Sequence, residues 1–404
     1  MRIRLSLVVA NLAALAFCLL TFSRHGVGFH PYRLDLDVYR LGSLTFLHGG
    51  NLYHGLPPTS SGVALPFTYP PFAAVLLSPL ALVPMAVASI AVTLAGIALT
   101  GITVREFTRS LSSGPWLHAY PRLNLSWLLP AALFLEPVHS TLEYGQVEIA
   151  LMALVSLDCL RSDPRWPRGA LTGLAAAVKL TPAVFVLFFL LRRDWRAAVT
   201  AAGSFTAATG AAFALDWHDS VQYWTHVITN TSRPGNAAFA ANQSISGLLA
   251  RAGVNPHTHA GTIAWLALSA TVIMVTVPGM RRALAAAEPA WALSLNAFAG
   301  LLVSPISWTH HWVWAEPGLL VLAVLSRRHS WRGGLAAAVA GVVVFAMSPV
   351  LLLPPGHDAE LWEQAAGSSY VIFAAGLLLL SAFATYRARP VLVDRDVNVP
   401  ARSP

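Results

Sequence analysis

Polar residues with the right chemistry for catalysis gather at a few places in an otherwise apolar sequence. The segment RLDLDVYRLG holds Asp35 and Asp37, two carboxylates spaced i, i+2. On a strand such a pair points to one side, but on a helix the two side chains diverge by about 200°, so that one could face a site. A carboxylate placed in this way can act as a general base toward a hydroxyl group. The alternative is a pair of surface aspartates that bind Arg33 and Arg40.

Three later segments contribute further polar groups. EYGQVE holds Gln146, AANQSIS holds Asn242, and SPISWTHHWVWAEP holds the adjacent pair His310 and His311. No third His or Cys stands at a recognised ligand spacing, so a metal site is not predicted. We expect the two histidines to form hydrogen bonds or to carry charge near an anion.

A single lysine, Lys179, lies inside the apolar stretch 169–191, in the motif KLTP. The proline, together with arginines at both ends of the stretch, predicts two half-helices that enter and leave on the same side and meet near Lys179. At 1.5 Å per residue, Lys179 would then lie roughly 16 Å from Arg168, about halfway through a membrane. The alternatives are one kinked span, and a lysine that only bonds to helix carbonyls at the break or reaches toward the interface.

The composition identifies the elements that must hold these residues. Only 11% of the 404 residues are charged and 56% are apolar, whereas soluble proteins carry about 25% charged residues. This excludes an ordinary soluble enzyme, a disordered chain and a DNA-binding protein. A helix needs about 20 apolar residues to cross a bilayer. Such runs predict an all-α, polytopic membrane protein with spans near 5–22, 85–104, 123–139, 146–161, 197–215, 260–278, 289–304, 312–326, 333–353 and 369–386.

The arginines predict the orientation of these spans. With the N-terminus inside, the arginines expected outside are Arg24, Arg33, Arg40, Arg233 and Arg251, and all the others fall inside. Cytoplasmic loops carry this excess of cations, so the net charge of +8 reflects topology and no nucleic-acid partner is expected. We expect one transmembrane domain over 1–386, outside loops near 23–84 and 216–259, a short interfacial helix near 72–82, and a polar cytoplasmic tail over 387–404.

The candidate polar residues then gather on the outside face, above a lysine inside the membrane. Transfer of a sugar from a lipid-linked phosphate needs such groups: a base for the acceptor hydroxyl, and cations or strong donors for the phosphate that leaves. No glycine-rich nucleotide cradle is visible, which fits a donor other than a nucleotide sugar. A transporter is the main alternative, because broken helices and intramembrane charges are also transporter features. A purely structural scaffold is a weaker one.

Six stretches, in order along the chain, resemble glycosyltransferase family 87, the integral-membrane transferases of GT-C type. They are DLDVYRLG, FTYPPFAAVLLSPL, YGQVEIALMAL, AVKLTPAVFVLFFLLRRDWRAA, NQSISGLLAR and SPISWTHHWVW. The resemblance implies about 10 to 12 transmembrane helices, an active site that faces outside, and a polyprenyl-phosphate-mannose donor. Within the family, the chain is most similar to the α-(1→2) mannosyltransferases that act on phosphatidylinositol mannosides or lipomannan. Some relatives transfer arabinofuranose, which stays an alternative.

The resemblance also implies roles for single residues. In the family, the expected base lies at the first Asp of a D-[FL]-x-V-Y pattern, which falls on Asp35, and Asp37 occupies the variable place. Either aspartate could therefore be the base. No cofactor and no metal are expected, and the partners are the lipid-linked donor, a glycolipid acceptor and membrane lipids. The residues expected to bind substrate are Asp37, Arg40, Tyr69, Gln146, Lys179, Asn242, Arg251, Trp308, His310 and His311.

Overall fold

The computed structural model describes residues 32–111, 131–230, 233, 235–352 and 361–384. Regular structure in these ranges is helical, and β-structure is limited to one isolated bridge between Asn242 and Trp308. The helices are α2 (Leu34–Leu47), α3 (Pro71–Ala81), α4 (Met85–Leu111), α7 (Glu136–Tyr144), α8 (Glu148–Leu160), α9 (Ala170–Val178), η1 (Thr181–Phe185), α10 (Val186–Leu191), α11 (Trp195–Leu215), α12 (Trp217–Gln222), η2 (Tyr223–Val227), α13 (Ile245–Arg251), α14 (His259–Ala285), α15 (Pro289–Val303), η3 (Thr309–Trp314), α16 (Ala315–Arg328), α17 (Arg332–Met347), η4 (Pro349–Leu352), α18 (Leu361–Gly367) and α19 (Ser369–Phe383).

Within the described ranges, three helices, α4, α11 and α14, are long and apolar enough to cross a membrane. Only 22%, 17% and 11% of their most apolar windows are buried inside the protein, so the remaining apolar surface suits lipid. The chain is therefore a membrane protein. The other expected spans that fall in the described ranges correspond to shorter helices, such as α8 with 13 residues and α15 with 15. The expected span 5–22 and the first part of 123–139, residues 123–130, lie outside the described residues; over 131–139 the chain is not one continuous helix, because a turn precedes α7, which begins at Glu136.

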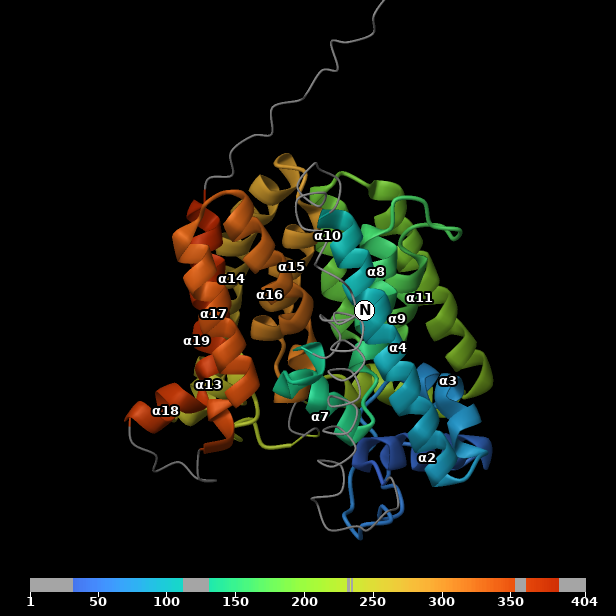
Figure 1. The fold of residues 1–404 in the computed structure, drawn as a ribbon. Coiled ribbons are helices and arrows are strands. Elements are labelled where there is room, and N and C mark those ends of the chain that lie inside the picture. The colour runs from blue at the N-terminus through green and yellow to red at the C-terminus, as the bar shows by residue number, and fades with distance from the viewer. Residues whose placement is uncertain (1–31, 112–130, 231–232, 234, 353–360, 385–404) are drawn as a thin grey trace, which may run out of the picture.

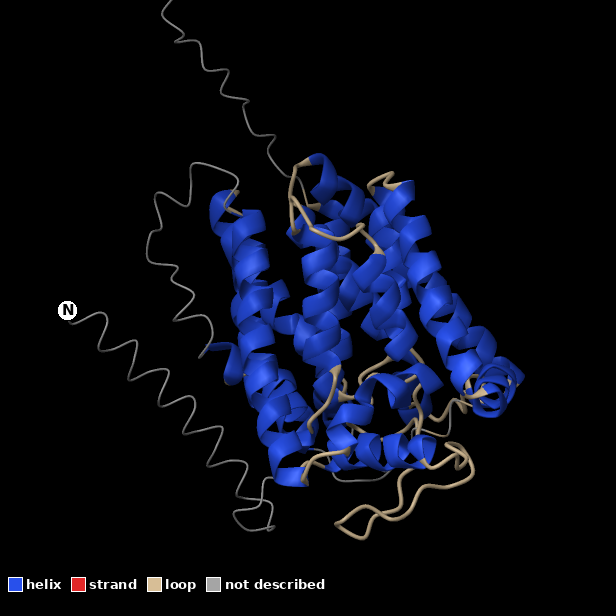
Figure 2. Ribbon diagram, turned by 90° about the vertical axis from the view of Figure 1, so that its right-hand side faces the viewer, coloured by secondary structure: helices blue, strands red, loops and turns tan. Residues whose placement is uncertain are grey.

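Small helices and loops lie at one end of the bundle. In Figure 1, α2, α3, α7, α13 and α18 lie toward the lower end of the bundle, and Figure 2 shows the same arrangement from the side. The proline pair Pro70–Pro71 starts α3, since proline is favoured at the first helical position. This helix ends at Ala81, close to the expected range, and is too short to span a membrane. The small helices thus build a separate layer at the end of the bundle.

The chain from 169 to 191 turns back on itself, as predicted. Arg168, just before α9, and Arg192, just after α10, both donate to the carbonyl oxygen of Cys159, at 3.3 and 3.2 Å. The two ends of the segment therefore lie on the same side. At the break, Lys179 has extended backbone angles (φ −147°, ψ 129°), and it separates α9 from η1.

Close packing against α11 holds α9 in place. A Cβ atom on Gly173 would lie 2.1 Å from the carbonyl oxygen of Ala201, so only glycine permits this approach. The carboxylate of Asp158 accepts hydrogen bonds from the backbone N–H groups of Gly169 and Thr172, at 3.0 and 2.9 Å. This carboxylate satisfies donors at the start of α9. The turn at Lys179 is thereby supported from the opposite end of the helix.

Candidate functional site

A cavity of about 470 Å³ opens between the layer of small helices and the helical bundle. Its walls come from the start of α2, the loop before α3, the turn between α7 and α8, the break after α9 and the segment before η3. Six residues expected from the sequence line this cavity: Asp35, Tyr69, Gln146, Lys179, Trp308 and His311.

On one wall, Asp35 is held by an amide. Its Oδ2 accepts a hydrogen bond of 2.7 Å from Nε2 of Gln146. The Oε1 atom of Gln146 in turn accepts from the hydroxyls of Tyr69, at 3.0 Å, and of Tyr39. Gly145, in the left-handed region with φ 69°, ends α7 and turns the chain toward α2. Because Oε1 of Gln146 accepts from the two tyrosines, the NH₂ group of the same amide faces the carboxylate of Asp35.

Burial shifts the protonation of Asp35, which lies in the first turn of α2, outside the candidate membrane spans. Burial raises the pKa of Asp35 to about 6, against the opposing effects of the hydrogen bond from Gln146 and the charge of Lys179. A general base works best when its pKa lies near the operating pH. Asp35 is thus ionised near neutrality and basic enough to accept a proton from a hydroxyl group.

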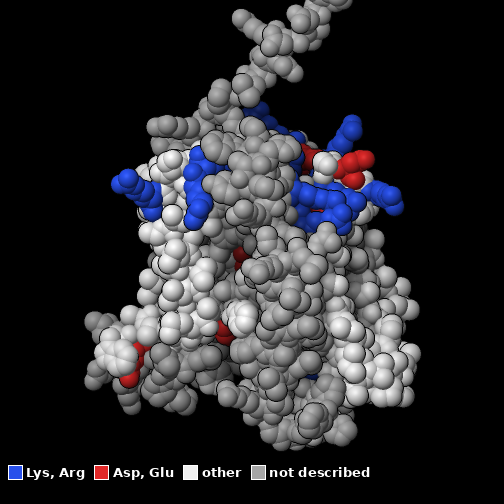
Figure 3. All heavy atoms as spheres, in the orientation of Figure 1, with Lys and Arg blue, Asp and Glu red and all other residues white. Residues whose placement is uncertain are grey.

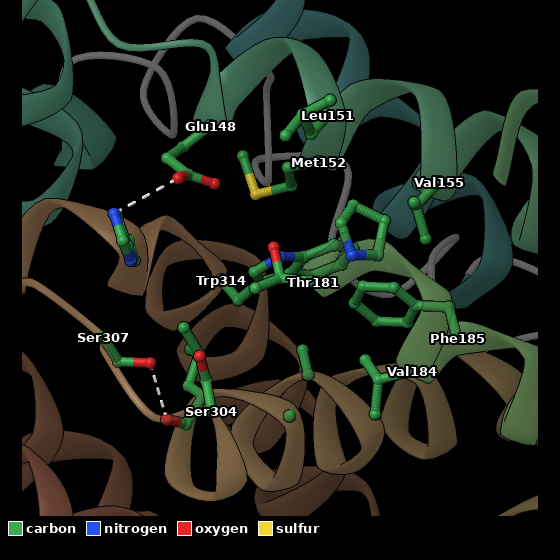
Figure 4. A pocket seen from close by; sticks show the side chains of 15 residues that line it. Glu148, Leu151, Met152, Val155, Thr181, Val184, Phe185, Ser304, Ser307 and Trp314 are labelled. Atoms are coloured by element: carbon green, nitrogen blue, oxygen red, sulfur yellow. Dashed lines mark hydrogen bonds and ion pairs between the residues drawn. The ribbon is translucent and has the colours of Figure 1, made fainter. Parts of the chain in front are cut away.

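On the other wall, Lys179 forms an ion pair with Glu148, the first residue of α8. Its Nζ also lies 3.2 Å from Nε2 of His311 and 5.2 Å from the ring centroid of Tyr69. An ammonium group can only donate, so Nε2 of His311 accepts this bond. Nε2 lies 3.4 Å from Oε1 of Glu148, the contact that is dashed in Figure 4. Lys179 is therefore held at the cavity, at the break in the re-entrant segment.

The structure separates the two aspartates. Asp37 is 6% exposed and does not line the cavity. Its Oδ2 accepts a hydrogen bond of 2.7 Å from the backbone N–H of Ser60, so it fixes the loop before α3. This is the divergence expected for an i, i+2 pair on a helix.

Arg40, Asn242 and Arg251 are also placed away from the cavity, where they bind backbone. Arg40 donates to the carbonyl oxygens of Leu80 and Val83, at 2.5 and 2.6 Å, at the end of α3. Asn242 is fully buried and accepts a bond of 3.0 Å from the backbone N–H of Ser307. Arg251 donates to the carbonyl oxygen of Asn242 at 2.9 Å. Arg40 thus connects α2 to the end of α3, and Asn242 and Arg251 connect the segment before α13 to its neighbours.

The two histidines occupy different environments. His311 lines the cavity, whereas His310 packs its ring against Tyr144, with the ring centroids 5.2 Å apart. The buried Nε2 of His310 has no hydrogen-bond partner among the described residues. The structure thus distinguishes His311 as the histidine that contacts Lys179.

Sequence reasoning missed two residues of the site, Tyr39 and Glu148. Tyr39 stands four residues after Asp35, a spacing that puts both on one face of a helix. Glu148 belongs to the EYGQVE segment and lies two residues after Gln146. No group of three or more His, Cys, Asp or Glu side chains is arranged to hold a metal ion in the described part of the chain.

Comparisons with known proteins identify the family. The sequence signature of glycosyltransferase family 87 matches residues 67–305. A polyprenol-phosphate-mannose-dependent alpha-(1-2)-phosphatidylinositol mannoside mannosyltransferase of Mycobacterium tuberculosis is 42% identical over 88% of this chain and 85% of its own length. Its counterpart in Mycolicibacterium smegmatis is 41% identical over 87% of this chain and 83% of its own.

A more distant relative of Mycolicibacterium smegmatis, a phosphatidylinositol pentamannoside mannosyltransferase, is 33% identical over 78% of this chain and 74% of its own length. Among solved structures, ArnT from Cupriavidus metallidurans bound to undecaprenyl phosphate covers 93% of this chain and 77% of its own, with 16% identity and a TM-score of 0.37. The match over 67–305 and the identity to the mycobacterial enzymes show that this chain is a glycosyltransferase and belongs to glycosyltransferase family 87.

Proposed function

We propose that this enzyme transfers mannose from polyprenyl-phosphate-mannose to a mannosylated glycolipid, a phosphatidylinositol mannoside or lipomannan, and forms an α-(1→2) linkage. The names of the two mycobacterial relatives at 42% and 41% identity support this donor, acceptor and linkage. The observation that carries the proposal is the placement of a carboxylate base, Asp35, and a cation, Lys179, on one cavity.

In the proposed reaction, Asp35 accepts the proton of an acceptor hydroxyl as that oxygen attacks the anomeric carbon of the donor. The bond from the anomeric carbon to the phosphate oxygen breaks, and its electron pair stays on the phosphate. Attack from the face opposite the phosphate converts a β-linked donor into an α-mannoside. The transition state is oxocarbenium-like, so most of the negative charge develops on the phosphate.

The second wall of the cavity supplies groups for that charge. Lys179 and His311 lie side by side, with Nζ and Nε2 at 3.2 Å. Lys179 is the donor of this pair, since Nε2 of His311 accepts from it, and a preorganised ammonium stabilises the charge that develops on a leaving group. Trp308 lines the same cavity and offers an apolar surface for a sugar ring or for the lipid next to the phosphate.

We also propose that the site faces the extracytoplasmic side. Lysine and arginine side chains gather toward the upper end of the face in Figure 3, and α2 and α3 lie toward the lower end in Figure 1. Cations favour the cytoplasmic side, which leaves the small-helix layer outside. We propose the GT-C architecture, about 10 to 12 spans, one domain over 1–386 and a cytoplasmic tail over 387–404; the tail and the first span lie outside the described residues.

The test is an assay of purified protein in detergent or liposomes with polyprenyl-phosphate-mannose and a panel of phosphatidylinositol mannosides. We expect a product one hexose heavier that an α-(1→2)-specific mannosidase shortens again. A polyprenyl-phosphate-arabinofuranose donor runs beside it. Transfer of arabinose alone would refute the mannose donor, and a product that resists the mannosidase would refute the linkage. Movement of lipid across liposomes without transfer would favour a transporter.

A further inference from the structure

Glu148 is an anion at the place where the proposed reaction needs cations. Its carboxylate is paired with Lys179, the cation proposed for the phosphate, and lies 3.4 Å from Nε2 of His311, which accepts from the same ammonium. The side chain is only 9% exposed. A buried carboxylate is costly unless it is paired, and Lys179 is the partner of Glu148, so a phosphate that takes Lys179 must displace Glu148 from this pair.

The charge of the phosphate changes during the reaction. The donor is a phosphodiester with one negative charge, whereas the lipid product is a phosphate monoester that carries about −1.5 to −2 near pH 7. The charged groups that face this region are the carboxylates of Asp35 on α2 and Glu148 on α8, and the ammonium of Lys179 after α9; His311 on η3 is the neighbouring titratable ring. Asp35 holds the acceptor proton when the product forms; once it has released this proton, two carboxylates face one ammonium and oppose a dianion more than a monoanion.

We propose that Glu148 is an internal anion that exchanges with the lipid phosphate on Lys179 and thereby drives release of the polyprenyl phosphate product. The proposal rests on the proposed function and adds a role for a residue that neither donates nor accepts the transferred group. Between turnovers Glu148 pairs with Lys179. The donor phosphate shares Lys179 with Glu148. Lys179 attracts the dianionic product more strongly, but Glu148 and ionised Asp35 together repel it more, so the product leaves and Glu148 pairs with Lys179 again.

Glu148 has space to move off Lys179. A smaller cavity adjoins the first and shares His311, Thr181 and Ser304 with it. Figure 4 shows Glu148 at the edge of this smaller cavity, with its carboxylate turned toward the interior and Thr181 and Ser304 on other walls. The hydroxyl of Thr181 can donate to a carboxylate, and that of Ser304, which donates to the carbonyl oxygen of Ile306 at 2.9 Å, would have to leave this partner to do so. This cavity gives the Glu148 side chain a polar wall to turn toward when a phosphate occupies Lys179.

The first test compares wild type with Glu148→Gln and Glu148→Asp in binding assays that need no transfer. The two probes are undecaprenyl phosphate and its methyl phosphodiester, which mimic the charges of product and donor. In Glu148→Gln we expect the affinity for undecaprenyl phosphate to rise about tenfold more than that for the methyl diester, because one repulsive charge is gone. Glu148→Asp keeps the charge, and its ratio of the two affinities should stay within about twofold of wild type.

Two outcomes would overturn the proposal. If Glu148→Gln weakens both probes equally, Glu148 only positions Lys179; if the ratio is unchanged, it does not discriminate charge. Wild type that transfers mannose but shows no preference between the probes would also count against Glu148 and leave the proposed function intact. Wild type that binds neither probe and transfers nothing would instead refute the proposed function.

A second test leaves Glu148 in place, in case Glu148→Gln fails to fold. Wild-type affinity for both probes is measured between about pH 5.5 and 8, across the second ionisation of a phosphate monoester near pH 6. Asp35 ionises in the same range and also opposes a dianion more than a monoanion, so the ratio of the two affinities is measured in wild type and in Asp35→Asn, where the remaining loss reports Glu148. We expect undecaprenyl phosphate to lose about fivefold or more relative to the methyl diester as pH rises. A constant ratio, or a relative gain for the monoester, would refute the proposal.

Discussion

Replacement of Asp35 by Asn is the most informative perturbation of the site. Asparagine has nearly the same shape, and its side-chain carbonyl can still accept the bond that Gln146 donates to Asp35 at 2.7 Å. It cannot take a proton from a hydroxyl group. Loss of a general base lowers kcat by about 10²–10⁴-fold, equivalent to about 3–5 kcal/mol in the barrier.

The same substitution should make the protein more stable. Burial raises the pKa of Asp35 from 3.8 to about 6, so the folded state binds the proton more tightly than the unfolded state. The free energy of unfolding is therefore highest below about pH 4 and falls as pH rises through 6. At pH 7.5 the ionised carboxylate costs about 3 kcal/mol, from roughly two pKa units at 1.36 kcal/mol each. Asparagine carries no charge and avoids this cost.

The assay combines mannose transfer with thermal unfolding in detergent at pH 7.5, and Asp37→Asn is the matched control. Asp37 lies on the same helical turn but binds the backbone N–H of Ser60. We expect its variant to keep kcat within about threefold and to lose about 1 kcal/mol of stability. In wild type, kcat/KM should fall about tenfold per pH unit below 6. A folded Asp35→Asn enzyme with more than about a tenth of wild-type activity, or an inactive Asp37→Asn enzyme, would refute the assignment.

Three further changes test the supports of the site. Tyr39→Phe removes a hydroxyl that orients the amide beside the base, and we expect kcat to fall about tenfold with little change in the unfolding temperature. Gly173→Ala places a methyl group against the carbonyl oxygen of Ala201, 2.1 Å away, and should lower stability by at least about 2 kcal/mol in a thermal scan. Arg328→Met removes the ion-pair partner of the buried Glu288, at 2.5 Å, and should cost about 3 kcal/mol in the same scan. Unchanged kcat in the first variant, or wild-type unfolding in the others, would contradict these expectations.

The re-entrant path of 169–191 could be predicted because its signals are local. Cations at both ends restrict which side each end occupies, and the proline after Lys179 limits the preceding backbone. The lengths of the transmembrane helices were harder to predict. Apolar runs such as 146–161 and 312–326 read as full spans, whereas α8 and α16 have 13 and 14 residues. Apolar composition alone does not distinguish a lipid-facing helix from one buried among other helices.

The polar residues of this apolar sequence are candidates for the site, but their polarity alone does not show which of them line the cavity. The sequence places Asn242 and Arg251 beside Gln146 as candidates because each is costly to bury. That cost can be met in two ways: by a substrate, or by backbone groups at helix ends and in loops. For Asn242 and Arg251 the cost of burial is met by backbone groups, since both side chains donate to backbone carbonyl oxygens of irregular segments. Whether such a side chain binds substrate or backbone depends on the path of the neighbouring backbone, which the sequence does not show.

The contacts between residues across the cavity could not be predicted from spacing in the sequence. Gln146 donates to Asp35 across 111 residues, and Lys179 meets His311 across 132. Glu148 shows the consequence most clearly. A glutamate at the start of a helix is already explained by the helix dipole, so nothing in the sequence marks it for a site. Its meaning changes once the re-entrant turn brings Lys179 against it, because the cavity then holds a carboxylate pair around one ammonium. The proposed release of the phosphate depends on the combined charge of Asp35, Glu148 and Lys179, and not on any one of these residues.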